Sequence, residues 1–256
     1  MTISPQAYIH RTATIGPYSI IEDDVEIGAR TIIGSHVVIR RGSRIGRNNR
    51  IGTGAQIGID PQDYHYRGEP SWCLIGDRNV IREYVTISRA TGRGERTVIG
   101  NDNFIMTYVH IAHNDVVGHG TVIASAVQLG GYVEIQDHAV VGGLSGVHQR
   151  CRIGAYAMLG AKSYLNKDLA PYLLARGNRA HIVGINVRGL RNHGFSWRSI
   201  ESIKTCYGVI RDQPINLSRT LGLLRKKFPD PRRRAIFDFI SSSGRGILLP
   251  LTVTAE

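Results

Sequence analysis

The chain has 256 residues, 42% of them hydrophobic, and a formal net charge of +12. No run of eighteen apolar residues is present, which excludes an ordinary membrane-spanning helix. The first residues have neither the charged segment nor the apolar run of a secretory signal, and the three cysteines lack metal-ligand spacing, so we expect free thiols and a cytoplasmic protein. A basic chain attracts nucleic acid, an anionic membrane or an acidic protein. Because no nucleic-acid motif is present, we expect no nucleic-acid partner.

An aliphatic residue recurs every six positions between Ile3 and Leu165. Isoleucine fills the first ten of these positions, and after two interruptions the same register resumes at Ile75 and at Ile99. A period of six matches neither an α-helix nor a simple alternating strand. It matches a coil with three flat faces and eighteen residues per turn, in which stacked turns share one apolar core. We therefore predict a mainly β fold, a parallel β-helix over residues 1–185.

Two further positions of the repeat support this coil. Glycine often follows the aliphatic residue, as at Gly16 and Gly28, which suits a corner where backbones approach closely or take a positive φ. Small or branched residues four positions after the aliphatic one, such as Val37 and Ala55, are expected to fill the interior. Spacing does not set the handedness, but the hexapeptide pattern resembles that of left-handed parallel β-helices, an exception to the right-handed crossover rule.

Two segments interrupt the repeat, and the C-terminal part of the chain lacks it. Residues 59–74 and 89–98 are polar or rich in Pro, Gly and aromatic residues, and we predict that both project as loops, which often carry function on a rigid scaffold. Residues 186–256 are predicted to form a small α-helical domain. Its helices are expected around Ile200–Ile210, over Leu217–Phe228, and from Asp230-Pro231 to a point before Gly244. Its basic cluster is either a solvated face or a landing surface for an acidic partner, and it consists of Arg225, Lys226, Lys227 and Arg232 to Arg234.

The eighteen-residue turn predicts which residues are neighbours, because two residues separated by eighteen positions lie about 4.8 Å from each other on adjacent turns. His113, Gly131 and Gln149 are therefore stacked, with His148 beside Gln149 and His110 around a corner from His113. Histidine is suited to general-base work near neutral pH, and a glycine offers an unshielded N–H for an oxyanion. The alternative is that these histidines are simply solvated. No histidine lies five residues from His113, a spacing used by zinc sites on such coils, so we expect no metal.

The chain resembles the acyl-ACP:UDP-N-acetylglucosamine O-acyltransferases, which start lipid A synthesis. The resemblance covers nearly the whole length and depends on an ordered set of motifs: Ile33-Gly-Ser-His-Val-Val-Ile39, Gly68-Glu69-Pro70, Ile75-Gly-Asp-Arg-Asn-Val-Ile-Arg-Glu83, His110-Ile-Ala-His113, Val147-His148-Gln149 and Gly194-Phe195-Ser196.

This resemblance implies a cytoplasmic homotrimer with active sites in the clefts between subunits, and no cofactor. The implied reaction moves an (R)-3-hydroxyacyl group from acyl carrier protein, an acidic partner, to the 3-hydroxyl of UDP-N-acetylglucosamine. His113 matches the family's general base, and Gly131 matches the glycine whose N–H faces the oxyanion. The positions that match substrate contacts are Asp63 in the first loop, His110, His148, Gln149, Ala161 (acyl length) and Asn186 (nucleotide). His65, which replaces a lysine of the loop, and Asn192 stand at two further substrate-binding positions.

Several positions depart from the family pattern. Asn114 stands where the family usually has Asp beside the base, and Tyr132 stands where it often has His. Arg188, Asn192 and His193 occupy the positions of an acidic residue and two arginines that handle the nucleotide. Two alternatives therefore stay open: an acyltransferase of the same fold with another nucleotide sugar or an amine as acceptor, and a non-catalytic solenoid that binds the carrier protein.

Overall fold

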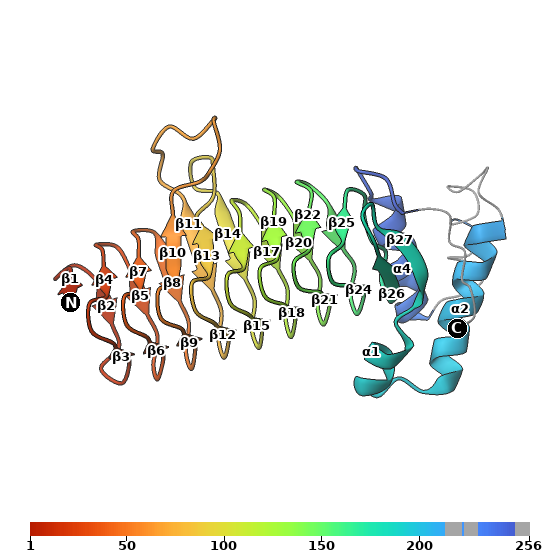
Figure 1. Ribbon diagram of the computed structural model, residues 1–256, viewed down its shortest axis with the longest axis horizontal. Coiled ribbons are helices and arrows are strands. Elements are labelled where there is room, and N and C mark those ends of the chain that lie inside the picture. Colours follow the sequence, from red (N-terminus) through yellow and green to blue (C-terminus); the bar gives the residue numbers. More distant parts are fainter. Residues whose placement is uncertain (213–221, 223–229, 249–256) are drawn as a thin grey trace.

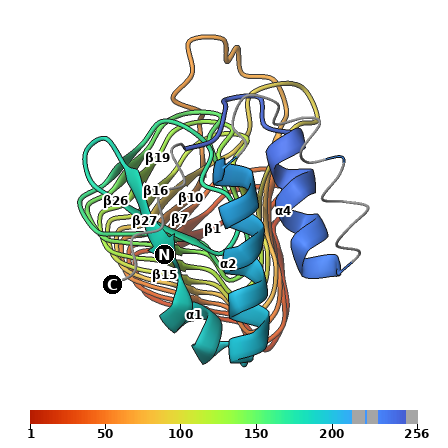
Figure 2. The ribbon, with the colours of Figure 1, turned by 90° about the vertical axis from the view of Figure 1, so that its right-hand side faces the viewer.

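The computed structural model describes residues 1–212, 222 and 230–248, and most of them form a long three-sided coil (Figure 1). Each side of the coil contributes one short strand per turn, and strands of the same side stack into a parallel sheet. Figure 2, which looks along the coil from its C-terminal end, shows helices lying across that end. The mainly β architecture predicted from the period of six is confirmed.

Up to β25, each of the three sheets contains every third strand in chain order, and β26 and β27 extend the third sheet. The first sheet consists of β1 (Thr2–Ile3), β4 (Ile20–Ile21), β7 (Val38–Ile39), β10 (Gln56–Ile59), β13 (Thr86–Ser88), β16 (His110–Ile111), β19 (Gln128–Leu129), β22 (Gly146–Val147) and β25 (Tyr164–Leu165). The second sheet consists of β2 (Tyr8–Ile9), β5 (Glu26–Ile27), β8 (Ser43–Ile45), β11 (Trp72–Ile75), β14 (Arg96–Ile99), β17 (Val116–Val117), β20 (Glu134–Ile135) and β23 (Arg152–Ile153). The third sheet consists of β3 (Thr14–Ile15), β6 (Ile32–Ile33), β9 (Arg50–Ile51), β12 (Val80–Ile81), β15 (Phe104–Ile105), β18 (Val122–Ile123), β21 (Val140–Val141), β24 (Met158–Leu159), β26 (Leu173–Arg176) and β27 (His181–Ile185).

The strand register follows the eighteen-residue step. Ile3 pairs with Ile21, and Ile21 pairs with Ile39. The aliphatic residue of each hexad points inward and is buried from Ile21 to Leu165, whereas those of the first turn are only half-buried because no turn covers them. These stacked side chains are the core that holds the coil together, since no single turn could bury its apolar row alone.

The corners of the coil differ in part from the prediction. Glycines after the aliphatic residue do allow close approach, since a Cβ on Gly16 would lie 2.6 Å from the carbonyl carbon of Gly34. Of the thirteen glycines that directly follow the aliphatic residue of a repeat, only Gly58 has a positive φ. The left-handed conformation falls instead on the third residue after the aliphatic one, where seventeen non-glycine residues adopt it, including Asn114 and Tyr132.

The two loops leave the coil on the same side and are joined to each other. The flanking strands leave residues 60–71 and 89–95 outside regular structure, and the longer loop rises above the coil in Figure 1. The Glu69 carboxylate accepts the N–H of Gly92 at 2.8 Å, and the N–H of Gly94 donates to the Pro70 carbonyl at 2.8 Å. The shorter loop therefore supports the longer one.

The C-terminal part closes the end of the coil with a hairpin and helices. The strands β26 and β27 are antiparallel, and α1 (Val187–Asn192), α2 (Trp197–Asp212) and α4 (Pro231–Ser241) follow. The apolar recurrence at 200–210 is buried along α2, and Asp230 caps α4 by accepting the N–H of Arg232 at 2.9 Å, as predicted. The helix predicted over Leu217–Phe228 lies outside the described residues, apart from Gly222.

Two polar contacts hold this part against the last turns of the coil. Tyr207 of α2 donates to the Pro171 carbonyl at 2.7 Å. Arg152 of β23 lies 3.0 Å from the buried Asp168 carboxylate and donates to the Phe239 carbonyl at 2.8 Å. A guanidinium that reaches both partners holds the helices at a fixed position on the coil.

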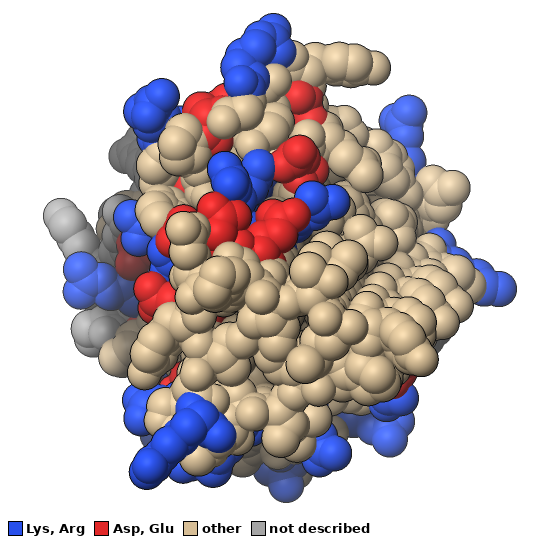
Figure 3. Space-filling view, turned by 90° about the vertical axis from the view of Figure 1, so that its left-hand side faces the viewer, with Lys and Arg blue, Asp and Glu red and all other residues tan. Residues whose placement is uncertain are grey.

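Several exposed arginines on the outer surface of the first turns pair with carboxylates. Arg40 and Arg41 lie 2.7 and 2.9 Å from carboxylate oxygens of Glu22 and Asp23, one turn earlier. Figure 3 shows acidic side chains gathered among basic ones on one side of the N-terminal end, with further basic side chains along the lower edge of the view. Exposed pairs of this kind contribute little to stability, so we assign this cluster no functional role.

Candidate active site

The corner after the first sheet carries His113, in the turn between β16 and β17. Its side chain is nine-tenths buried and lies over Gly131 of the next turn, as the eighteen-residue step predicts. A Cβ on Gly131 would lie only 2.5 Å from Nε2 of His113. Only glycine therefore leaves room for the imidazole here. No backbone carbonyl of the described residues accepts the Gly131 N–H, so this amide is free to meet a ligand.

Asn114 determines which nitrogen of His113 carries the proton. The side-chain amide of Asn114 pairs with the backbone of Thr91 at two points: Oδ1 accepts the Thr91 N–H at 2.9 Å, and Nδ2 donates to the Thr91 carbonyl at 3.1 Å. This pairing fixes the orientation of the amide, because only Oδ1 can face an N–H group. Oδ1 also lies 2.9 Å from Nδ1 of His113, which must then be the donor. The lone pair of the neutral imidazole is therefore on Nε2, beside Gly131.

Asp63 reaches this imidazole from the long loop between β10 and β11. Its Oδ2 lies 3.8 Å from Nε2 of His113. A hydrogen bond from the backbone N–H of His65 lowers the pKa of Asp63 to about 2, and the His65 ring and the charge of protonated His113 contribute in the same direction. The Asp63 carboxylate is therefore ionised at neutral pH and presents a negative charge next to the His113 ring. His65 itself is mostly exposed, with its Nδ1 2.9 Å from Asp63.

His110 lies on the outer side of β16, close to His113. Its Nδ1 is 2.7 Å from the Thr86 hydroxyl of the preceding turn. Burial lowers the pKa of His110, and a protonated His113 lowers it further. His110 is therefore neutral at neutral pH and can serve as a hydrogen-bonding group beside His113.

His148 and Gln149 lie one turn beyond Gly131, as predicted, and Gln149 is exposed. Sequence reasoning missed the partner of His148, which is Arg245 from the C-terminal segment. Nδ1 of His148 lies 3.0 Å from the Arg245 guanidinium and 3.1 Å from the Gln149 carbonyl. Nothing in the sequence around Arg245 indicates this contact, because it depends on how the C-terminal segment folds back onto the coil.

The structure does not bring the other three predicted residues to His113 within one chain. Ala161 is exposed at the corner after the third sheet, whereas His113 follows the first sheet. Asn186 is buried as the cap of α1, where it accepts the Gly189 N–H at 3.1 Å and donates to the Tyr156 carbonyl at 2.9 Å. Asn192 is exposed at the end of α1. These residues can share a site with His113 only if a second copy contributes them.

A ring contact at His113, metal binding and membrane spanning complete the description. Tyr132, at the position flagged as a departure, packs its ring edge-on to His113 with centroids 5.3 Å apart. Within the described ranges, no three His, Cys, Asp or Glu side chains are grouped as a metal site requires. In the same part of the chain, no helix is both long and apolar enough to cross a membrane.

Comparison with known proteins identifies the family. Residues 6–41 match the family model described as bacterial transferase hexapeptide repeats, and residues 168–248 match the one described as UDP-N-acetylglucosamine O-acyltransferase, domain 2. The chain is 42% identical over 247 residues to an acyl-ACP–UDP-N-acetylglucosamine O-acyltransferase from Thermodesulfovibrio yellowstonii, with 96% of each chain covered. A Paraburkholderia phymatum protein of the same name is 44% identical over 252 residues, again with 96% of each chain covered.

A solved structure agrees over almost the full length. The UDP-N-acetylglucosamine acyltransferase of Francisella novicida has a TM-score of 0.94 and 36% identity, and the match covers 98% of this chain and 93% of that one. The predicted fold, a left-handed parallel β-helix with a small C-terminal α-helical domain, is thereby confirmed. The chain belongs to the acyl-ACP–UDP-N-acetylglucosamine O-acyltransferase family.

Proposed function

We propose that this protein transfers an (R)-3-hydroxyacyl group from acyl carrier protein to the 3-hydroxyl of UDP-N-acetylglucosamine, the first step of lipid A synthesis. The observation that carries the proposal is the unprotonated Nε2 of His113 beside the free amide of Gly131. A base and an oxyanion donor on the two sides of one small space are what acyl transfer to a hydroxyl requires.

The proposed reaction has two steps. Nε2 of His113 accepts the proton of the sugar 3-hydroxyl while its oxygen attacks the thioester carbonyl carbon. The Gly131 N–H donates to the oxyanion that forms. The carbon–sulfur bond then breaks, the acyl group stays on the sugar oxygen, and the imidazolium returns its proton to the departing thiolate. Asn114 holds the reactive tautomer throughout, and the ionised Asp63 stabilises the transient imidazolium.

We further propose that the working unit is a homotrimer with sites between subunits. The outward side chains of the third sheet are apolar over most of its length: Ile32, Val80, Phe104, Val122, Val140 and Met158. The adjoining corner exposes Tyr84, Tyr108 and Leu144. An apolar face of this extent favours association, and a second copy could bring its Ala161 to the His113 corner of the first.

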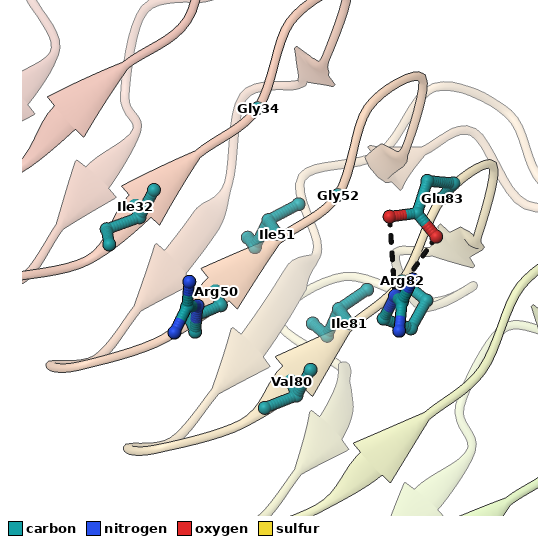
Figure 4. A pocket seen from close by; sticks show the side chains of 9 residues that line it. All are labelled: Ile32, Gly34, Arg50, Ile51, Gly52, Val80, Ile81, Arg82 and Glu83. Carbon is teal, nitrogen blue, oxygen red and sulfur yellow. Dashed lines mark hydrogen bonds and ion pairs between the residues drawn. The ribbon is translucent and has the colours of Figure 1, made fainter.

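A hollow on the same sheet fits this assembly. It has a volume of about 440 Å³ and is lined by strands β6, β9 and β12. Figure 4 shows Ile32 and Val80 beside Arg50 on these strands, with the paired Arg82 and Glu83 at one edge. In the proposed trimer, a side chain of the neighbouring copy fills this hollow.

The donor explains the charge of the chain. An acidic carrier protein is attracted to a protein with a net charge of +12, which raises the rate of encounter. Arg232, Arg233 and Arg234 at the start of α4 are the proposed landing surface. Because acyl carrier protein and the UDP-sugar are the substrates, we place the protein in the cytoplasm.

The test is product analysis with purified protein. Hydroxyacyl carrier proteins of several chain lengths are incubated with UDP-N-acetylglucosamine or with its 3-amino counterpart, and the products are identified by mass spectrometry. We expect an ester of UDP-N-acetylglucosamine. Exclusive amide formation would instead support the amine acceptor left open by the sequence. His113→Ala is expected to lower kcat by at least about a hundredfold, whereas His10→Ala, on a corner of the first turn, is expected to leave it unchanged. A fully active His113→Ala protein would rule out the general-base role.

A further inference from the structure

Asp115, two residues after His113, turns its carboxyl group into the interior of the coil. It is fully buried, at 0% exposure, and burial raises the pKa of the carboxyl well above its ordinary value. Within the described part of the chain, it has no ion-pair partner. A buried carboxyl without a counter-charge costs free energy that an apolar residue at this position would not. An apolar residue fits this interior position, because Val133 occupies it one turn later and is also buried.

One of the two hydrogen bonds of Asp115 is common to the coil. Its Oδ1 accepts the N–H of Val133 in the next turn at 2.8 Å. Hydroxyl groups at the matching position of other turns do the same: Ser19 accepts the Val37 N–H at 3.1 Å, and Ser145 accepts the Ser163 N–H at 3.1 Å. A carboxyl group is therefore not needed for this bond.

The other hydrogen bond is specific to the turn that carries His113. Oδ2 of Asp115 accepts the N–H of Ala112 at 3.0 Å. At the same corner of other turns this N–H donates to the next strand, as from Arg40 to the Ile57 carbonyl at 2.9 Å and, one turn after Ala112, from Gly130 to the Val147 carbonyl at 2.9 Å. Accordingly, the ladder pairing between β16 and β19 contains His110 and Gln128 and does not continue toward Ala112. Asp115 thus replaces one ladder bond with a bond inside the turn.

The bond between Asp115 and Ala112 lies next to the two proposed reacting groups, the His113 imidazole and the Gly131 N–H. Ala112 directly precedes His113, and Val133 follows Gly131 by two residues, so the carboxyl group joins the two backbone segments that carry the imidazole and the free amide. We propose that Asp115 is a positioning residue that sets the distance between the His113 imidazole and the Gly131 N–H. This inference rests on the proposed function, which makes those two groups the base and the oxyanion donor.

Asp115→Ser separates the two bonds. A serine hydroxyl can keep the bond to Val133, as Ser19 and Ser145 do in their turns, but it loses the bond to Ala112. The interior accepts serine at this corner, since Ser43 is fully buried at the corresponding position. We expect a folded protein that binds UDP-N-acetylglucosamine with unchanged affinity by calorimetry, and whose kcat falls by about ten- to a hundredfold, because small misplacement of reacting groups has effects of this size. Ser19→Ala, which removes the common bond far from the site, is the control and should keep its kcat.

A double-mutant cycle with His113→Ala excludes a merely structural role. If Asp115 acts through His113, adding Asp115→Ser to His113→Ala causes no further loss of the residual rate. An equal loss in both backgrounds, or unchanged kcat in a folded Asp115→Ser protein, overturns the inference and leaves the proposed function standing. Full activity of His113→Ala overturns the proposed function itself. If the serine variant does not fold, Asp115→Asn, which retains one acceptor oxygen, is measured in the same cycle and judged by the same outcomes.

Discussion

The corner after the first sheet and the C-terminal end of the molecule were both predicted to hold substrate-handling residues, and they differ sharply. At the corner, Gly131 and Asp63 each lie next to the His113 imidazole within one chain. At the C-terminal end, Asn186 is occupied as a helix cap and Asn192 is exposed without a partner group of the site nearby. One chain therefore brings the proposed reacting groups together, whereas the residues expected to measure the acyl chain and the nucleotide lie apart from them within that chain.

The difference has a physical origin. The corner is assembled by the coil itself, because the eighteen-residue step stacks His113 and Gly131 whatever else surrounds them. The C-terminal residues are placed by packing of helices against the last turns, through contacts such as Tyr207 to Pro171. Mutations at the corner should therefore change chemistry with little effect on folding, and mutations at the C-terminal end should show the reverse.

Among variants of the two regions, Gly131→Ala is expected to have the largest effect on activity. The new Cβ would lie 2.5 Å from Nε2 of His113, so the ring must move away from the amide. We expect kcat to fall by about a hundredfold, as for loss of an oriented base or oxyanion donor. Steady-state kinetics with a hydroxyacyl carrier protein measures this. Gly146→Ala is the matched control, since a Cβ there meets its nearest neighbour, Tyr164, at an ordinary 3.6 Å. Wild-type kcat in Gly131→Ala would contradict the assigned geometry.

Phe104→Arg tests whether the two regions meet only through association. Phe104 points outward from β15 on the apolar third sheet, so an arginine there would be buried without a partner in the proposed trimer. We expect sedimentation to show monomers and the activity to fall by at least about tenfold, while the circular dichroism spectrum stays unchanged. Val116→Arg, at an exposed position of the second sheet, should remain trimeric and active. A fully active Phe104→Arg monomer would show that one chain suffices.

The sequence predicts residue positions correctly where the six-residue period determines them. It does not predict contacts that form only when a distant segment folds back onto the coil. The stacking of His113, Gly131 and Gln149 follows from the repeat alone. Arg245 could not be predicted, because it meets His148 only after the C-terminal segment has packed on the coil. Asp115 could have been found, since it lies four residues after Ile111, a position already predicted to face the interior. The pairing of Asn114 with Thr91 was out of reach, because it joins the coil to a loop without a period.

Asn186→Ala is expected to have the smallest effect on activity, and it tests the C-terminal end in place of the His113 corner. Asn186→Ala removes both the cap of Gly189 and the donor to the Tyr156 carbonyl, which should lower the free energy of unfolding by about 1–2 kcal/mol in a denaturant titration. Because both polar atoms already have partners within the chain, the KM for the UDP-sugar should change little. Asn192→Ala, at an exposed position on the same helix, should leave stability within about 0.5 kcal/mol and therefore reports on substrate contact alone. A tenfold rise of KM in Asn186→Ala at unchanged stability would mean that this asparagine serves the nucleotide and not the helix, and that the C-terminal end is a binding region in its own right.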